Sequence, residues 1–294
     1  MKKLMLLVNP VAGKGSAKSV LMSIVSCFND AGYETTVYVS SPERSIQYLA
    51  DEFGWHYDMV VCIGGDGTLS ETVNGLLKDG NPPPVLGYIP AGSTNDFAST
   101  LGLPKNLLET AALIAKNEPV PVDLGYYNGN YFTYVAAFGA FANVSYATPQ
   151  KTKNTFGHLA YIFEGLANLP SIKPVHITIE YDGSTLSGDF IFGCVANSTS
   201  VGGFVKIDPN LVLLNDGLFE VILVRNPMNI IDFTNVISSI ISQSYDNGNV
   251  VLLHAKKIKF TFDTAVDWSR DGEYGGTYST ITIENKHEAI QIVR

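Results

Sequence analysis

The sequence predicts an α/β domain followed by a mainly antiparallel β domain. Apolar strands alternate with helical patterns up to about residue 120, and short strand patterns joined by hairpin turns follow. The length of 294 residues lies near the size at which one hydrophobic core divides, about 250–300 residues. We therefore expect domains at 1–122 and 123–294, and leave open whether the last strand returns to the first domain.

The first half alternates strand and helix in order. Strands are expected at Lys3–Val8, Glu34–Ser40, Asp58–Ile63 and Val85–Ile89, and helices at Ser16–Ala31, Glu43–Phe53, Leu69–Lys78 and Leu107–Lys116. Because the strands are almost continuously apolar, helices should cover both faces of a parallel sheet. Ligands of such sheets bind at the carboxyl ends of the strands, so the loops Asn9–Gly15, Gly64–Thr68 and Pro90–Asn95 should share one edge. We expect the active site in the cleft between the two domains.

The second half loses this alternation. Strands are expected at Tyr126–Phe138, Val175–Tyr181, Thr185–Ala196, Leu218–Val224, Ile258–Phe262 and Thr280–Glu284, and helices at Gly157–Leu169 and Asn229–Ser242. The dipeptides Asn128-Gly129 and Asp182-Gly183 are hairpin signals, which favours antiparallel pairing.

Charge and cysteine content exclude several classes of protein. The net charge of −9 argues against a nucleic-acid-binding protein and against non-selective binding to anionic lipid. The apolar stretches are far shorter than the ~20 residues that a membrane-spanning helix needs. Cys27, Cys62 and Cys194 are dispersed in apolar segments, which predicts buried thiols in a reducing cytoplasm.

Two clusters of lysines stand out. Lys256, Lys257 and Lys259 alternate with apolar residues, as on a solvated strand face. Lys151 and Lys153 lie in a polar stretch. For these two, docking to a membrane, a solvated loop and contact with ATP phosphates are all left open.

A glycine turn follows the third strand, in the run Cys62-Ile63-Gly64-Gly65-Asp66-Gly67-Thr68-Leu69-Ser70-Glu71. Glycines let the backbone approach another group closely, and the following helix start offers free N–H groups to an anion. A carboxylate beside phosphates calls for a divalent cation or a basic group between them, so Asp66 indicates a metal or nucleotide contact. A structural alternative explains part of the run, because Thr68 and Glu71 fit a capping box. It does not require two consecutive glycines before Asp66.

An ordered set of motifs resembles the catalytic domain of diacylglycerol kinases and their soluble bacterial lipid-kinase relatives. The motifs are Asn9-Pro10-Val11-Ala12-Gly13-Lys14-Gly15, Gly64-Gly65-Asp66-Gly67-Thr68, Pro90-Ala91-Gly92-Ser93-Thr94-Asn95-Asp96-Phe97-Ala98, Ser145-Tyr146-Ala147-Thr148-Pro149, Leu214-Asn215-Asp216-Gly217-Leu218 and Asp271-Gly272-Glu273-Tyr274-Gly275-Gly276. NAD kinases and phosphofructokinases share the glycine–aspartate turn, so one motif alone is weak. The ordered set covers nearly the whole chain and is strong.

The resemblance implies roles for individual residues. Nucleotide contacts are expected from Asn9, Pro10, Val11, Ala12, Gly13, Ser40, Gly65, Asp66, Gly67, Thr68, Leu69, Ser70, Glu71 and Ser93. Asp271 and Glu273 match an acidic pair that acts as, or supports, the general base, and Asp66 and Asp123 match a metal-linked hydrogen-bond network. The carboxylate of Asp216 and the carbonyls of Leu213 and Leu218 match a magnesium site. Without the resemblance, Asp216-Gly217 and Asp271-Gly272 would be interpreted as plain turns.

The resemblance also implies an activity. The expected enzyme is an ATP-dependent, Mg²⁺-requiring lipid kinase that transfers the γ-phosphate to the hydroxyl of diacylglycerol or a similar lipid, giving phosphatidic acid. Two carboxylates ~4 Å apart repel by about 4 kcal/mol at an effective dielectric of 20, so several carboxylates in one cleft call for a bound cation.

Alternative functions stay open on the sequence alone. The sequence does not separate diacylglycerol from other lipid alcohols as the acceptor, such as a sphingoid base, phosphatidylglycerol or a polyprenol, because acyl-chain pockets are generic apolar surface. Less favoured are an NAD kinase-like enzyme and a non-catalytic nucleotide-binding regulator. The regulator would not need the acidic pair of Asp271 and Glu273. The expected partner is lipid at a membrane surface, contacted peripherally and transiently by a cytoplasmic protein. A homodimer is left open, and no nucleic acid is expected.

Overall fold

The computed structural model describes residues 1–294 except 16, 79, 81, 140–172, 202–204 and 246–247. The chain divides into two compact units, Met1–Leu124 with Lys286–Arg294, and Gly125–Asn285. Two strands, β5 (Pro119–Tyr127) and β15 (Glu273–Val293), contribute residues to both units. The expected helix Gly157–Leu169, the motif Ser145–Pro149 and the lysines Lys151 and Lys153 lie outside the described residues.

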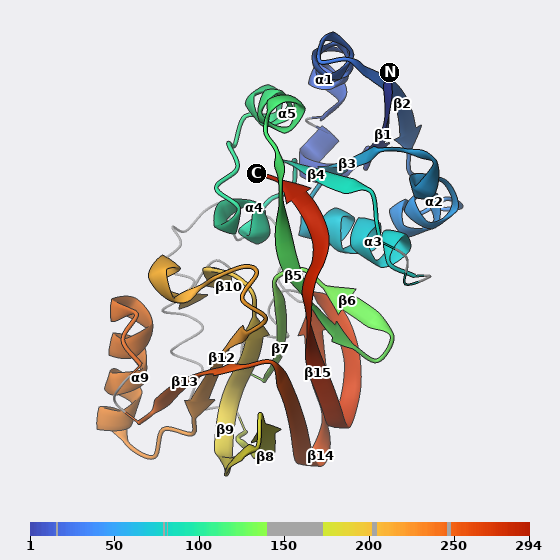
Figure 1. The fold of residues 1–294 in the computed structure, drawn as a ribbon. Coiled ribbons are helices and arrows are strands. Elements are labelled where there is room, and N and C mark those ends of the chain that lie inside the picture. The colour runs from blue at the N-terminus through green and yellow to red at the C-terminus, as the bar shows by residue number, and fades with distance from the viewer. Residues whose placement is uncertain (16, 79, 81, 140–172, 202–204, 246–247) are drawn as a thin grey trace. The chain divides into compact units, whose positions relative to one another are not determined.

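The first unit is a parallel sheet covered by helices on both faces. Its elements are β1 (Lys2–Val8), η1 (Ala12–Gly15), α1 (Ala17–Asp30), β2 (Tyr33–Val39), α2 (Ile46–Phe53), η2 (Gly54–His56), β3 (Met59–Gly64), α3 (Asp66–Leu76), β4 (Val85–Pro90), α4 (Asp96–Thr100) and α5 (Leu107–Lys116). The strand order is β2-β1-β3-β4, with the end of β15 added in parallel beside β4 through Ile292 and Leu86. Helices α1 and α5 pack together on one face, and α2 and α3 on the other (Figure 1).

The expected strands and helices of this unit are confirmed, with small shifts at their ends. Helix α3 begins at Asp66 rather than Leu69, because Gly65 and not Thr68 stands at its N-cap. Helix α2 begins at Ile46, since the side chain of Ser45 accepts the Tyr48 amide and caps the helix there. Helix α4 was not predicted, because its five residues are too few to show a helical period.

The second unit is built from antiparallel strands. Its elements are β6 (Asn130–Phe132), β7 (Val135–Gly139), β8 (Val175–Tyr181), β9 (Ser184–Ala196), β10 (Ser200–Val201), β11 (Val205–Lys206), η4 (Pro209–Leu211), β12 (Phe219–Arg225), α9 (Ile230–Ser242), β13 (Val250–Ala255) and β14 (Lys257–Arg270), with most of β15. Strands β7, β9, β8 and β14 pair in a closed cycle, and β12 and β13 extend the sheet from β9. The cycle encloses an aromatic core around Trp268, Phe138 and Phe260.

One expected strand is wrong in the second half. The segment Tyr126–Phe138 belongs to three strands rather than one. Asn128 and Gly129, with φ of 46° and 81°, turn the chain between β5 and β6, and β7 begins only after Thr133 and Tyr134. A second hairpin at Asp182 and Gly183, with φ of 42° and 86°, joins β8 to β9 as expected. Strands β14 and β15 are longer than the expected strands Ile258–Phe262 and Thr280–Glu284, and β13 was not predicted.

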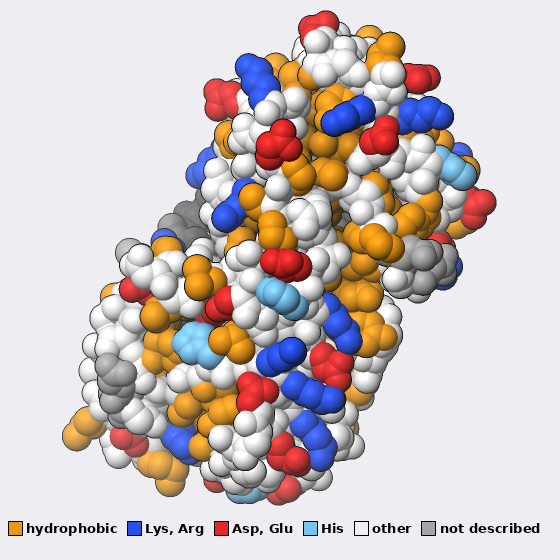
Figure 2. Space-filling view, in the orientation of Figure 1, with side chains coloured by type: hydrophobic (Ala, Val, Ile, Leu, Met, Phe, Trp, Pro, Cys, Tyr) orange, Lys and Arg blue, Asp and Glu red, His pale blue; other side chains and the backbone are white. Residues whose placement is uncertain are grey.

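The lysines of β14 and the residue before it lie on a solvated face. Lys257 pairs with Glu284 at 2.8 Å and Lys259 with Glu180 at 2.9 Å, both across neighbouring strands. Figure 2 shows basic and acidic side chains intermixed over the part of this unit where β14 and β15 run. The predicted solvated face is confirmed, and charge pairing accounts for these two lysines.

Candidate active site

The loop after β1 is tied to the glycine turn after β3. The side chain of Asn9 donates from Nδ2 to the Thr68 hydroxyl at 3.1 Å, and its Oδ1 accepts the Val11 amide at 3.2 Å. The Asn9 amide also donates to the Ile63 carbonyl at 3.1 Å. Because β1 and β3 run parallel and in register, both loops leave the sheet at the same edge, as expected.

The loop after β4 reaches the same edge and touches the glycine turn. The Ala91 amide donates to the Gly64 carbonyl at 2.7 Å. A Cβ on Gly92 would lie 2.5 Å from the Gly65 Cα, closer than any side chain permits. A Cβ on Gly64 would likewise lie 2.2 Å from the Thr68 hydroxyl oxygen. Close packing therefore requires glycine at Gly64 and Gly92, independently of any ligand.

The capping-box interpretation of Thr68 and Glu71 is wrong. Helix α3 already begins at Asp66, so Thr68 lies inside its first turn, and Gly65 makes no side-chain cap. The Thr68 hydroxyl instead accepts the hydrogen bond from Asn9, while Glu71 is exposed to solvent. The two residues therefore have separate environments.

Asp66 holds the start of α4. Its Oδ2 accepts the Asp96 amide at 3.0 Å and its Oδ1 accepts the Phe97 amide at 3.3 Å, and both amides belong to the first turn of that helix. A carboxylate at a helix N-terminus is favoured by the exposed N–H groups and the helix dipole. The Tyr88 hydroxyl also donates to Asp66 at 3.5 Å, and burial, followed by the charge of Asp66, raises the pKa of Tyr88 well above its ordinary value. Asp66 therefore joins the loops after β3 and β4.

The remaining predicted nucleotide residues differ in exposure. Val11, Ser93 and Glu71 are exposed, Pro10, Ala12, Gly13, Ser40, Gly65 and Gly67 are half-buried, and Leu69 and Ser70 are buried. The Leu69 side chain is fully buried in the unit, so only its backbone is placed to meet a ligand. The Ser40 amide donates to the Val8 carbonyl at 3.0 Å, which places Ser40 at the same edge as Asn9.

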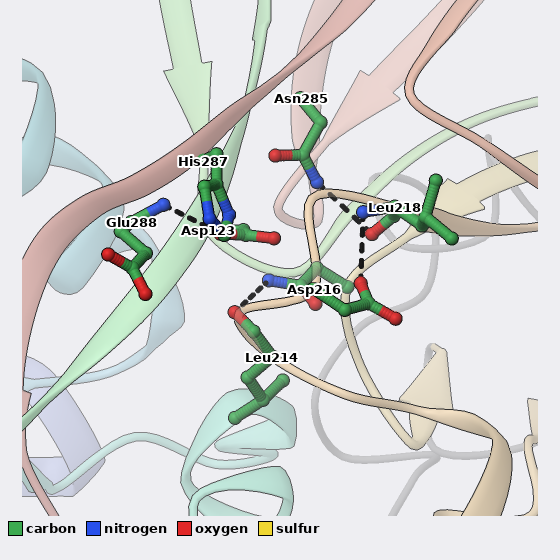
Figure 3. Close-up of polar contacts among 8 residues, drawn as sticks. Asp123, Leu214, Asp216, Leu218, Asn285, His287 and Glu288 are labelled. Carbon is green, nitrogen blue, oxygen red and sulfur yellow. Dashed lines mark hydrogen bonds and ion pairs between the residues drawn. The ribbon is translucent and has the colours of Figure 1, made fainter. Parts of the chain in front are cut away.

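Asp123 is held by the last strand. Its side chain is fully buried, and its Oδ1 accepts the Glu288 amide at 2.7 Å and the His287 Nδ1 at 2.9 Å (Figure 3). His287 itself is half exposed, so its ring lies between the buried carboxylate and solvent. His287 was not predicted from the sequence, because no motif gave a signal for it. The expected hydrogen-bond network between Asp66 and Asp123 stays a prediction.

Asp271 is fixed by backbone amides from a distant segment. Its carboxylate accepts the amides of Thr133 at 2.8 Å, Tyr134 at 3.0 Å and Val135 at 3.3 Å, and only 3% of the residue is exposed. These three hydrogen bonds hold the carboxylate rigidly in place.

Glu273 lies across the same turn but faces solvent. Asp271 and Gly272 have φ of 47° and 82°, the left-handed pair that a two-residue hairpin uses, and they join β14 to β15. Arg270 and Glu273 are backbone partners across this turn in the β14–β15 ladder, and Glu273 is exposed. The two acids therefore belong to one hairpin turn, in which the carboxylate of Asp271 is buried and that of Glu273 is accessible.

The expected magnesium loop is an Asx turn. The Asp216 Oδ1 accepts the Leu218 amide at 2.9 Å, and no donor among the described residues reaches its Oδ2 (Figure 3). The Leu218 carbonyl accepts Asn285 Nδ2 at 3.1 Å, and the Leu214 carbonyl accepts Asn197 Nδ2 at 3.5 Å. Asp216 is exposed, and Leu213 beside it is 58% exposed. The loop thus offers an accessible carboxylate oxygen with neighbouring carbonyls, the oxygen ligands that a hard cation takes.

Glu220, two residues beyond this loop, was missed by the sequence analysis. It is fully buried, and neither carboxylate oxygen accepts a hydrogen bond in the part of the chain that the structure describes. Burial, with a contribution from the charge of Asp216, raises the pKa of Glu220 to about 8. The available signal was a charged residue inside the apolar run from Leu218 to Val224.

The described residues contain no cluster of three or more His, Cys, Asp or Glu side chains arranged to hold a metal ion. The expected ligand set has one carboxylate and two carbonyls, so it is not of that kind. The same residues form no helix long and apolar enough to cross a membrane.

Both halves of the chain match known protein families. Residues 3–127 match the diacylglycerol kinase catalytic domain, and residues 134–294 match the YegS C-terminal NAD kinase beta sandwich-like domain. The chain is 34% identical over 279 residues to a diacylglycerol kinase of Bacillus subtilis (strain 168), which covers 94% of this chain and 91% of the relative. It is 33% identical over 277 residues to a diacylglycerol kinase of Staphylococcus aureus (strain MRSA252), covering 94% and 87%.

Solved structures show the same architecture. The crystal structure of a putative diacylglycerol kinase from Bacillus anthracis str. Sterne matches with a TM-score of 0.83 and 27% identity, over 99% of this chain and 95% of that one. An NAD kinase from Archaeoglobus fulgidus, solved in complex with ATP, matches with a TM-score of 0.56 and 14% identity, over 99% and 93%. The second likeness is one of fold alone.

Proposed function

Because this chain belongs to the diacylglycerol kinase family, we propose that it transfers the γ-phosphate of ATP to the hydroxyl of diacylglycerol or a similar lipid. It is a lipid kinase, with a catalytic-domain match over residues 3–127 and relatives that bear that name. With diacylglycerol as acceptor the product is phosphatidic acid. Lipid kinases with other acceptors remain the alternative, and a lipid panel separates them.

The observation that carries the proposal is the joining of three loops at one edge of the first unit. Asn9 binds Thr68, Gly92 abuts Gly65, and Asp66 holds the helix that follows the third loop. Parallel sheets bind ligands at the carboxyl ends of their strands, and glycine-rich turns there leave room for phosphates. In the proposal, the backbone of these loops holds the phosphates of ATP, with contributions from Ser40 and Ser93.

The proposal gives the acidic pair two different tasks. Phosphoryl transfer to an alcohol requires a group that accepts the hydroxyl proton, and this group must be accessible. Asp271 is buried and accepts three amides, whereas Glu273 is exposed one hairpin turn away. Glu273 therefore takes the proton, and Asp271 fixes the turn that presents it.

Magnesium belongs to the proposal as a cation held by the loop 213–218. The carboxylate of Asp216 and the carbonyls of Leu213 and Leu218 would hold it, and it would neutralise negative charge around the phosphates. Asp66 and Asp123 are proposed to belong to a hydrogen-bond network linked to this cation and to orient its groups. The lipid substrate requires transient, peripheral contact with a membrane surface.

A lipid panel tests the proposal. Purified protein is incubated with γ-labelled ATP, Mg²⁺ and mixed micelles of diacylglycerol, sphingosine, phosphatidylglycerol or a polyprenol, with NAD as a non-lipid acceptor, and the products are separated by chromatography. We expect labelled phosphatidic acid from the wild type and from Asp263→Asn, an exposed acid in β14 that serves as control, and little from Asp66→Asn. Label in NAD alone, or in none of the acceptors, would refute the proposal.

A further inference from the structure

Asn285 is a buried residue of β15 whose side chain reaches the loop 213–218. Its Nδ2 donates to the Leu218 carbonyl at 3.1 Å, across 67 positions of the chain, and only 6% of the residue is exposed. Its backbone is fixed as well, because its amide donates to the Lys256 carbonyl at 2.9 Å. The side chain that meets Leu218 is therefore carried by an anchored strand, and Figure 3 shows it directed at that residue.

The contact from Asn285 continues through Leu218 to Asp216. The Leu218 amide donates to Asp216 Oδ1 at 2.9 Å, while the Leu218 carbonyl accepts from Asn285. Gly217, between Asp216 and Leu218, has a φ of 81°, a conformation that residues with a side chain rarely adopt. Two consecutive hydrogen bonds thus fix the direction of a carbonyl and of a carboxylate in the same loop.

A second buried asparagine holds the other end of the loop. Asn197 directly follows β9, is fully buried, and donates from Nδ2 to the Leu214 carbonyl at 3.5 Å. Its amide donates to the Tyr134 carbonyl at 3.0 Å. A hydrogen bond of 3.5 Å is long and weak, so Asn285 makes the firmer of the two contacts with the loop.

The hydrogen bond from Asn285 matters for a cation because it orients one of the proposed ligands. A carbonyl oxygen has two lone pairs, so the Leu218 oxygen that accepts from Asn285 keeps one for a metal ion. Groups that hydrogen-bond to metal ligands orient them, and their loss typically lowers metal affinity by about 10–100-fold. The bond from Asn285 is therefore of the kind that sets how tightly a loop holds a cation.

We propose that Asn285 is a positioning residue of the divalent-cation site in the loop 213–218, acting through the Leu218 carbonyl and, beyond it, Asp216. This inference rests on the proposed function, in which that loop holds Mg²⁺. Asn285 is itself neither a ligand of the ion nor a contact of the reacting phosphate. A residue that served only to attach the start of β12 to β15 would change the stability of the protein but not the affinity of the folded loop for a cation.

The test measures metal binding directly, without ATP or lipid. Mn²⁺, which takes the same oxygen ligands as Mg²⁺ and whose bound and free forms are distinguished by electron paramagnetic resonance, is titrated into wild type, Asn285→Leu, Asp216→Asn and the control Asn117→Leu. Leucine is close to asparagine in size and lacks the donor. Asn117 makes a matching bond outside this loop, from Nδ2 to the Arg294 carbonyl at 3.1 Å. We expect Asn285→Leu to weaken Mn²⁺ binding at least tenfold and Asn117→Leu to leave it unchanged.

The outcomes separate this inference from the proposed magnesium site. If Asp216→Asn loses Mn²⁺ while Asn285→Leu binds it as the wild type does, Asn285 serves only the fold and the inference alone is overturned. If the wild type binds no Mn²⁺, or if Asp216→Asn binds it unchanged, the magnesium site and the inference both fail. Should Asn285→Leu not fold, Asn285→Ala is measured instead, since it removes the donor without adding apolar bulk. Unchanged binding by that variant also overturns the inference.

Discussion

Gly92 faces Gly65 so closely that a Cβ on Gly92 would lie 2.5 Å from the Gly65 Cα. The two residues stand in the loops after β4 and β3, 27 positions apart along the chain. Their approach lets the carboxylate of Asp66, next to Gly65, reach the amides of Asp96 and Phe97. The glycines of the two motifs thus have a packing role in addition to any contact with phosphate.

Gly92→Ala tests this packing role. Overpacking of a tight contact costs about 1–3 kcal/mol, so the urea midpoint should fall and kinase activity with it. The control is Gly102→Ala, where an added Cβ meets nothing within 4 Å and only the positive φ of 71° opposes the change. A Gly92→Ala protein as stable as the wild type would show that the two loops separate easily.

Asp66→Asn tests the central carboxylate of the glycine turn. The amide keeps an oxygen for one of the two α4 amides but loses the charge, so stability should fall by about 1 kcal/mol. Turnover should fall at least a hundredfold, or about 3 kcal/mol. The two effects are measured by urea unfolding and by steady-state phosphorylation of diacylglycerol in mixed micelles. Turnover close to that of the wild type would remove Asp66 from the catalytic residues.

Asp271→Asn and Glu273→Gln should separate support from proton transfer. Asn places an NH₂ group against amides that now donate to Asp271, and losing such charged hydrogen bonds should cost about 2–3 kcal/mol of stability. Glu273 is exposed, so its Gln variant should keep stability within about 0.5 kcal/mol. Its turnover should nevertheless fall by about a hundredfold or more, as for a lost general base. A Glu273→Gln enzyme with full turnover would contradict the assignment.

Thiol labelling tests the burial of the cysteines. Burial raises the pKa of Cys62 and of Cys194 to about 12, so at pH 8 only on the order of one thiol in 10,000 at each site is the reactive thiolate. Cys27 is half-buried, which corrects the expectation that all three are buried. Iodoacetamide at pH 8 should therefore modify one cysteine of the native protein and three in urea. Peptide mass spectrometry that finds rapid native labelling at Cys62 or Cys194 would contradict this burial.

The strands of the first unit follow closely from the sequence. Segments such as Leu4–Val8 and Val60–Ile63 are continuously apolar because both faces of their sheet are covered, and such runs are visible in one dimension. Their parallel direction then fixes that the loops after them share an edge. The strands of the second unit are harder to predict, because β14 and β15 extend beyond their apolar segments through polar, half-exposed residues without a clear alternation.

The sequence by itself determined which segments are expected to carry chemistry: the glycine turn at Asp66 as a local motif, and the Asp216 loop and the Asp271 hairpin through their resemblance to a known family. Only the tertiary structure decided what surrounds each carboxylate. The amides that fix Asp271 come from Thr133 to Val135, more than 130 residues away, and the burial of Glu220 depends on strands on either side of it. The environment of a charge is set by groups that meet through folding, and spacing along the chain does not record them.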